Sequence, residues 1–83
     1  MKAYVLHAVN DLRYDEINIP KCPKDWAIVQ VKAAGICSSD IARIFTKGTY
    51  HFPTIPGHEF SGIVHSVGDE KDSNLVGVKV GVF

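Results

Sequence analysis

Five short runs of β-forming residues constrain this 83-residue chain more than any other feature. Apolar side chains that alternate with polar ones, or are β-branched, as is typical of strands, run through residues 1–8, 12–19, 26–36, 60–67 and 76–83. Pro20 and Pro23 interrupt the pattern, and so does the charged segment 68–74, so loops are predicted there. The chain is therefore predicted to be mainly β and to form one small domain.

One helix is predicted between the third and fourth strands. Ser38 is placed to cap its first turn, Ile41 and Phe45 follow at helical spacing, and Gly48 stands where a helix of this length would end. The chain has no G-x-G-x-x-G motif, so we expect no dinucleotide to bind here in the manner of a Rossmann domain.

The composition narrows the class of protein. Nine acidic and nine basic side chains balance, so no basic surface for nucleic acid is expected. No run is long enough to span a membrane and no signal-peptide pattern opens the chain, which favours a cytoplasmic protein without a membrane partner. The last run, residues 76–83, is apolar without a polar close, and we interpret the chain as the N-terminal piece of a longer protein.

The segment IPGHEFSG, residues 55–62, sets His58 and Glu59 side by side between glycines. Burying such polar groups is costly unless something binds them. Cys37 opens the predicted helix, and its sulfur together with an imidazole nitrogen and a carboxylate oxygen suits zinc. Taken singly, Cys37 is more simply a buried apolar filler and the His58–Glu59 segment a surface turn. Cys22, between two prolines, is interpreted as a loop thiol without a role.

GICSSD at residues 35–40 and PGHEFSGIVHSVG at residues 56–68 resemble the zinc-binding medium-chain alcohol and polyol dehydrogenases. The resemblance implies that residues 1–83 form the family's N-terminal GroES-like domain, a partly open β-barrel with one short helix. It implies zinc as cofactor, an alcohol or polyol as substrate, and a homo-oligomer. NAD(P) would bind to a Rossmann domain absent from these residues.

The resemblance also assigns roles to single residues. Cys37 and His58 match the first two zinc ligands, and Glu59 matches a glutamate that binds the metal or exchanges with substrate oxygen. Ser39 matches the hydroxyl that passes the alcohol's proton toward solvent, and Asp40 the carboxylate behind the histidine. Ser39, Asp40 and Glu59 are therefore the expected catalytic residues, with zinc activating the alcohol as hydride leaves for the nicotinamide.

Within the family, the sorbitol dehydrogenase-like and galactitol-1-phosphate dehydrogenase-like branch is the most similar. Arg43 lies four residues after Ser39, so the two share a helix face, and its guanidinium can pair with a substrate phosphate. A plain surface ion pair is the alternative for Arg43. One departure is Gly77-Val78, where the family has glycine–aspartate before the last strand. A second hypothesis for the whole chain is a metal-free GroES-like module for structure or self-association, without catalysis.

Overall fold

A computed structural model describes all residues from Met1 to Phe83. The chain divides into two compact units. The hairpin unit contains Met1–Ile19 and Ile36–Gly57, and the sheet unit contains Pro20–Gly35 and His58–Phe83. Each unit holds one open antiparallel sheet, and neither sheet closes into a barrel. A mainly β fold with one short α-helix is thereby confirmed.

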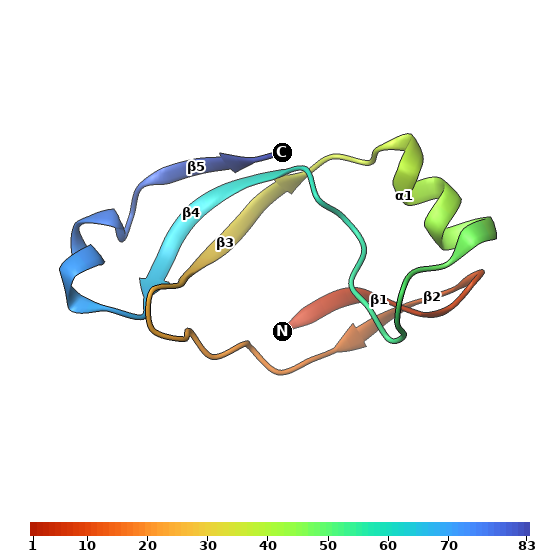
Figure 1. Ribbon diagram of the computed structural model, residues 1–83, viewed down its shortest axis with the longest axis horizontal. Helices are drawn as coiled ribbons and strands as arrows, with labels where there is room; N and C mark the ends of the chain where they lie inside the picture. The colour runs from red at the N-terminus through yellow and green to blue at the C-terminus, as the bar shows by residue number, and fades with distance from the viewer. The chain divides into compact units, whose positions relative to one another are not determined.

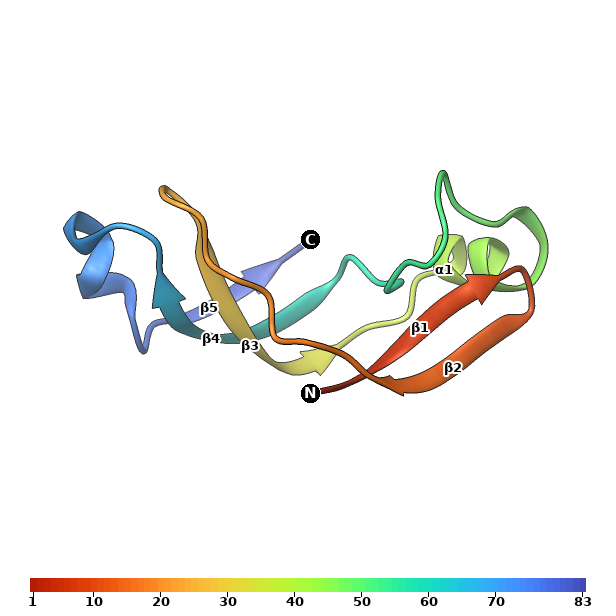
Figure 2. The ribbon, with the colours of Figure 1, turned by 90° about the horizontal axis from the view of Figure 1, so that it is seen from below.

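The hairpin unit is a two-stranded hairpin with a helical segment. Strands β1 (Lys2–Ala8) and β2 (Asp11–Glu16) pair antiparallel, with Tyr4 opposite Tyr14 and the two ring centroids 4.9 Å apart. Asn10, at φ 63°, makes the tight turn, as asparagine does more readily than most residues. Its main-chain N–H donates to the Ile44 carbonyl at 2.7 Å, which ties the hairpin turn to the helical segment beside it (Figures 1 and 2).

The helical segment of the hairpin unit has two kinds of turn. Helix α1 (Ser38–Ala42) continues directly into η1 (Arg43–Lys47), which is a turn of π-helix. Gly48, at φ 72°, ends it, as expected from the sequence. Leu6 on β1 is fully buried and exchanges two main-chain hydrogen bonds with Thr54, at 2.7 and 3.0 Å.

The sheet unit is three-stranded in the order β3–β4–β5, formed by Ala27–Ala34, Phe60–Val67 and Lys79–Val82 (Figure 1). Val64 on the central strand is its buried apolar residue. Gly62 allows β3 and β4 to approach closely, because a Cβ there would stand 2.2 Å from the Gln30 carbonyl oxygen. The turn before β5 forms around Gly77 at φ 89°, whose N–H donates to the Val64 carbonyl at 2.8 Å. The departure at Gly77-Val78 therefore does not prevent this turn.

Three sequence-based expectations need correction. The cap of α1 is Cys37 and not Ser38, which is already the first helical residue. The segment expected to be a loop contains a 3₁₀ helix, η2 (Glu70–Leu75), because the Asp69 carboxylate caps it by accepting from Lys71 N–H at 3.1 Å. The last strand begins only at Lys79, since the preceding residues make the turn. No helix in the structure has the length and apolar character needed to cross a bilayer.

Candidate functional site

His58 and Glu59 lie in the sheet unit, immediately before β4. Gly57 precedes them at φ 120°, a conformation that side chains other than glycine rarely adopt, and it turns the chain into the strand. The His58 Nε2 atom lies 3.8 Å from Glu59 Oε1. Their side chains are 41% and 43% exposed, so a nitrogen and an oxygen donor stand together and remain accessible to a ligand.

Gly35, which follows β3, is hydrogen-bonded to the segment that contains His58 and Glu59. The ladder between β3 and β4 runs to the pair Ala34 and Phe60, and one step further Gly35 N–H donates to the Glu59 carbonyl at 2.8 Å. A Cβ built on Gly35 would stand 3.6 Å from Glu59 Oε2, so the Glu59 carboxylate lies over Gly35. The chain leaving β3 and the chain entering β4 are thus fixed side by side up to residues 35 and 59.

Cys37 and Asp40 lie in the hairpin unit at the start of α1. Cys37 has extended backbone angles, and its N–H donates to Asp40 Oδ2 at 3.0 Å. Asp40 is only 4% exposed, and its Oδ1 atom lies 3.7 Å from Arg43 Nη1. The Asp40 carboxylate therefore stabilises the first turn and orients the Cys37 main chain. Its spacing of three residues from the cap is the sequence signal for this role.

Ser39 and Arg43 share one face of the helical segment, as expected from their spacing. Arg43 Nη1 lies 3.5 Å from Ser39 Oγ and donates to it. Arg43 also lines an open pocket of about 530 Å³ together with Lys47, Gly48, Thr49, Tyr50, His51 and Thr54. No carboxylate is among these lining residues. Lys47 and Thr49 were not predicted, although Lys47 stands four residues after Arg43 and continues its face.

Cys22, expected to have no role, and two histidines outside the candidate site have ordinary surroundings. Cys22 is a loop thiol whose Sγ lies 3.3 Å from the Trp26 carbonyl oxygen, and the structure contains no disulfide. His7 Nε2 lies 2.6 Å from Asp15 Oδ2, across the β1–β2 hairpin. His65 is exposed on β4.

The order and spacing of these features can be compared with known proteins. Residues 23–83 match the family described as the alcohol dehydrogenase GroES-like domain. The chain belongs to this family. Sorbitol dehydrogenase from Bombyx mori is 35% identical over 85 residues, which cover 96% of this chain and 24% of that protein. Galactitol 1-phosphate 5-dehydrogenase from Escherichia coli is 37% identical over 73 residues, which cover 87% of this chain and 21% of that protein.

Solved structures agree with this membership in the alcohol dehydrogenase GroES-like domain family. The crystal structure of galactitol-1-phosphate dehydrogenase from Escherichia coli superposes with a TM-score of 0.85 at 34% identity, covering 98% of this chain and 24% of that one. An Escherichia coli alcohol dehydrogenase complexed with NADH gives 0.83 at 36% identity, covering 98% and 23%. The chain thus spans about a quarter of the length of these proteins.

Proposed function

We propose that Cys37, His58 and Glu59 bind a catalytic zinc ion. The main-chain bond between Gly35 and Glu59 carries this proposal. Cys37 is two residues beyond Gly35, so chain connectivity alone keeps their Cα atoms within about 7.6 Å of each other. His58 is bonded directly to Glu59. All three residues therefore start from the same end of the β3–β4 ladder, within reach of one ion.

The donor set fits the metal. Thiolate sulfur, imidazole nitrogen and carboxylate oxygen are the three ligand types that zinc takes in proteins, and a site with three protein ligands leaves a position for substrate. His58 and Glu59 are both partly exposed, so an ion and an alcohol can reach them. We infer that the protein is the metal-binding domain of a zinc-dependent alcohol or polyol dehydrogenase that uses NAD(P).

The residues of this chain would divide the work as follows. Zinc supplies Lewis acidity, which lowers the pKa of an alcohol. The Ser39 hydroxyl, positioned by Arg43, accepts the alcohol's proton and relays it toward solvent. Asp40 keeps the Cys37 main chain in place through its 3.0 Å bond. In this proposal it would also be the carboxylate that orients His58, as the family resemblance implies. Residues 1–83 have no pyrophosphate-binding glycine motif, so this proposal gives them no part in binding the hydride acceptor.

The pocket beside Arg43 supports a phosphorylated polyol as substrate. Its volume of about 530 Å³ falls within the range usual for small-molecule sites. Lys47 and Arg43 both line it and no lining residue is acidic, although Arg43 Nη1 also lies 3.7 Å from Asp40 Oδ1 outside the lining. A similar protein from Escherichia coli is a galactitol 1-phosphate 5-dehydrogenase, which agrees with such a substrate. Arg43 would form a forked pair with the phosphate and Lys47 a point-charge contact.

Metal analysis tests the zinc site. The protein, purified without chelator and supplied with zinc, should retain one equivalent, whereas Cys37→Ser and His58→Ala should lose it. Cys22→Ser is the matched control and should retain zinc like the wild type, because Cys22 lies in a loop and contacts Trp26. Zinc retained by both ligand variants, or lost equally from the control, would refute the site. Absence of metal from every variant together with concentration-dependent association would favour the metal-free module.

Substrate preference tests the Arg43 pocket. In an enzyme that contains this domain, Arg43→Ala should reduce kcat/KM for a polyol phosphate by at least about tenfold while leaving the free polyol nearly unchanged, because a charge-assisted hydrogen bond is lost. Lys24→Ala removes a charge outside the pocket and should leave kcat/KM unchanged for both substrates. Equal losses on both substrates would exclude a phosphate contact.

A further inference from the structure

A second, smaller groove lies on the three-stranded sheet and shares no lining residue with the Arg43 pocket. It has a volume of about 250 Å³. Its lining comes from all three strands: Lys32, Ser61, Gly62, Ile63, Lys79 and Val80. Lys32, Ser61 and Lys79 are exposed, while Gly62 forms the buried floor. The groove thus has a floor of small residues on β4, with Lys32 on β3 at one side and Lys79 on β5 at the other.

The strand register explains why both lysines point to this groove. On β5, Lys79 stands directly opposite Ile63. On β3, the register shifts between Val31 and Ala33, so Lys32 is the extra residue of a β-bulge and falls outside the ladder. Bulges re-aim side chains in this way. Since neighbouring strands lie about 4.8 Å apart, β3 and β5 are roughly 10 Å apart, and two lysine side chains can converge over β4.

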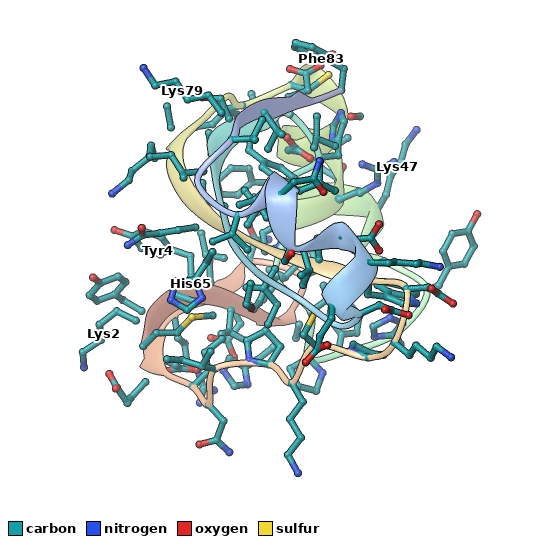
Figure 3. All side chains as sticks on the ribbon, turned by 90° about the vertical axis from the view of Figure 1, so that its left-hand side faces the viewer. Lys2, Tyr4, Lys47, His65, Lys79 and Phe83 are labelled. Atoms are coloured by element: carbon teal, nitrogen blue, oxygen red, sulfur yellow. The ribbon has the colours of Figure 1, made fainter.

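The charged residues that line the groove are all positive. Two other lysines have a carboxylate partner: Lys2 Nζ lies 3.4 Å from Glu16 Oε2, and Lys71 Nζ lies 3.0 Å from Asp25 Oδ1. No carboxylate lines the groove between Lys32 and Lys79, and Lys79 projects outward from its strand (Figure 3). Ser61, on β4 between the two lysine-bearing strands, adds a hydroxyl donor to the lining. Two cations and one donor around a small floor match a compact, doubly charged anion.

We propose that the Lys32–Lys79 groove binds a phosphate group, either free or as the headgroup of a small phosphomonoester. The size decides between ligands, because about 250 Å³ lies below the volume usual for whole cofactors and drug-sized molecules but accommodates a phosphate. The two lysines neutralise the dianion, and Ser61 donates to a phosphate oxygen. The site uses none of the residues proposed for zinc or for the Arg43 pocket, so it stands or falls separately.

An NMR titration of the whole 83-residue protein tests the site. Inorganic phosphate and glycerol 3-phosphate are added separately at constant ionic strength and about pH 8, with a chelator present so that bound metal does not contribute. The expected result is saturable movement of the Ser61, Gly62 and Val80 amide signals. Lys32→Gln and Lys79→Gln should each weaken the affinity by about tenfold, because each removes one charge-assisted contact.

Control variants distinguish binding at the groove from a general attraction of anions to surface charge. Lys24→Gln removes an exposed charge outside the groove, and Arg43→Ala disables the other cationic pocket; both should bind at the groove like the wild type. Tighter binding of the ester than of inorganic phosphate would assign the site to a phosphomonoester, and the reverse order to free phosphate. The proposal is overturned if the groove amides do not move, if the shifts do not saturate, or if Lys24→Gln weakens binding as much as the groove variants.

Discussion

Substituting Gly62 by alanine is the most direct test of how the three-stranded sheet supports the site. Gly62 sits on β4 opposite Val31 on β3 and Val80 on β5. An added Cβ would stand 2.2 Å from the Gln30 carbonyl oxygen and 2.8 Å from Val29 Cγ1. The first neighbour is main chain and cannot rotate away, so β3 and β4 must separate.

The cost follows from that separation. Ordinary contacts to a Cβ begin at 3.4 Å, so the strands must part by roughly 1 Å at this point. Two ladder hydrogen bonds then weaken, each worth about 1 kcal/mol net, and the overpacked site adds at least about 1 kcal/mol. We expect Gly62→Ala to lower the free energy of unfolding by about 3 kcal/mol. A chain of this length has roughly 4–12 kcal/mol in total, so the loss is severe.

Thermal denaturation followed by circular dichroism measures the effect. A loss of about 3 kcal/mol corresponds to a fall in Tm of roughly 12–24 °C in a domain of this size. Gly81→Ala, in the neighbouring strand β5, is the matched control, because the atom nearest to an added Cβ there belongs to the flexible Phe83 ring, at 3.6 Å. Its Tm should change by no more than a few degrees. Equal Tm values for the two variants would refute the close approach of β3 and β4.

Three further perturbations concern the hairpin unit. Asp40→Ala should lower the free energy of unfolding by about 1 kcal/mol, because the Cys37 N–H loses its acceptor at the start of α1. Tyr4→Ala should lower it by about 1 kcal/mol, because the ring contact with Tyr14 is lost. Glu16→Gln should reduce the loss of stability in acid: the N-terminal ammonium, then Lys2, hold the pKa of Glu16 below its ordinary 4.5, so its contribution is present above pH 4.5 and disappears as the pH falls through the lowered pKa.

Urea denaturation measures all three. Glu70→Ala, which removes an exposed carboxylate of η2, should leave stability nearly unchanged, and a loss as large as that of Asp40→Ala would contradict the capping role. Tyr50 is fully exposed, so Tyr50→Ala is the control for Tyr4→Ala. An acid-unfolding midpoint that is identical in wild type and Glu16→Gln would show that the charge pair at the N-terminus contributes nothing to folding.

Strand β4 was the element most accurately predicted from the sequence. Residues 60–67 carry aromatic and β-branched side chains, and Gly68 follows the last of them, so composition and the stop signal agree. The final strand was predicted three residues too early, because Val76 and Val78 look like strand residues but lie exposed in the turn that Gly77 makes. β-Propensity alone does not separate a strand from an apolar turn.

The candidate site was predictable in its residue types but not in its supporting bonds. The motifs around Cys37 and His58 are legible in the sequence. The bond from Gly35 to Glu59 is a main-chain contact between residues 24 positions apart, and no side-chain pattern reports it. The π-turn that follows α1 also left no signal, because Arg43–Lys47 reads as ordinary helix. The choice of Cys37 over Ser38 as cap was decided by the Asp40 carboxylate, which bonds three residues back.

The hydrogen bond from Gly35 to Glu59 joins two main-chain groups, so it does not depend on the Glu59 carboxylate. Replacing the glutamate by glutamine, aspartate or histidine should therefore leave the backbone route intact while altering the chemistry offered at that position. In the zinc site proposed above, such a substitution would change the ligand offered to the ion and leave the scaffold as it is. This separation makes position 59 a practical starting point for engineering metal selectivity.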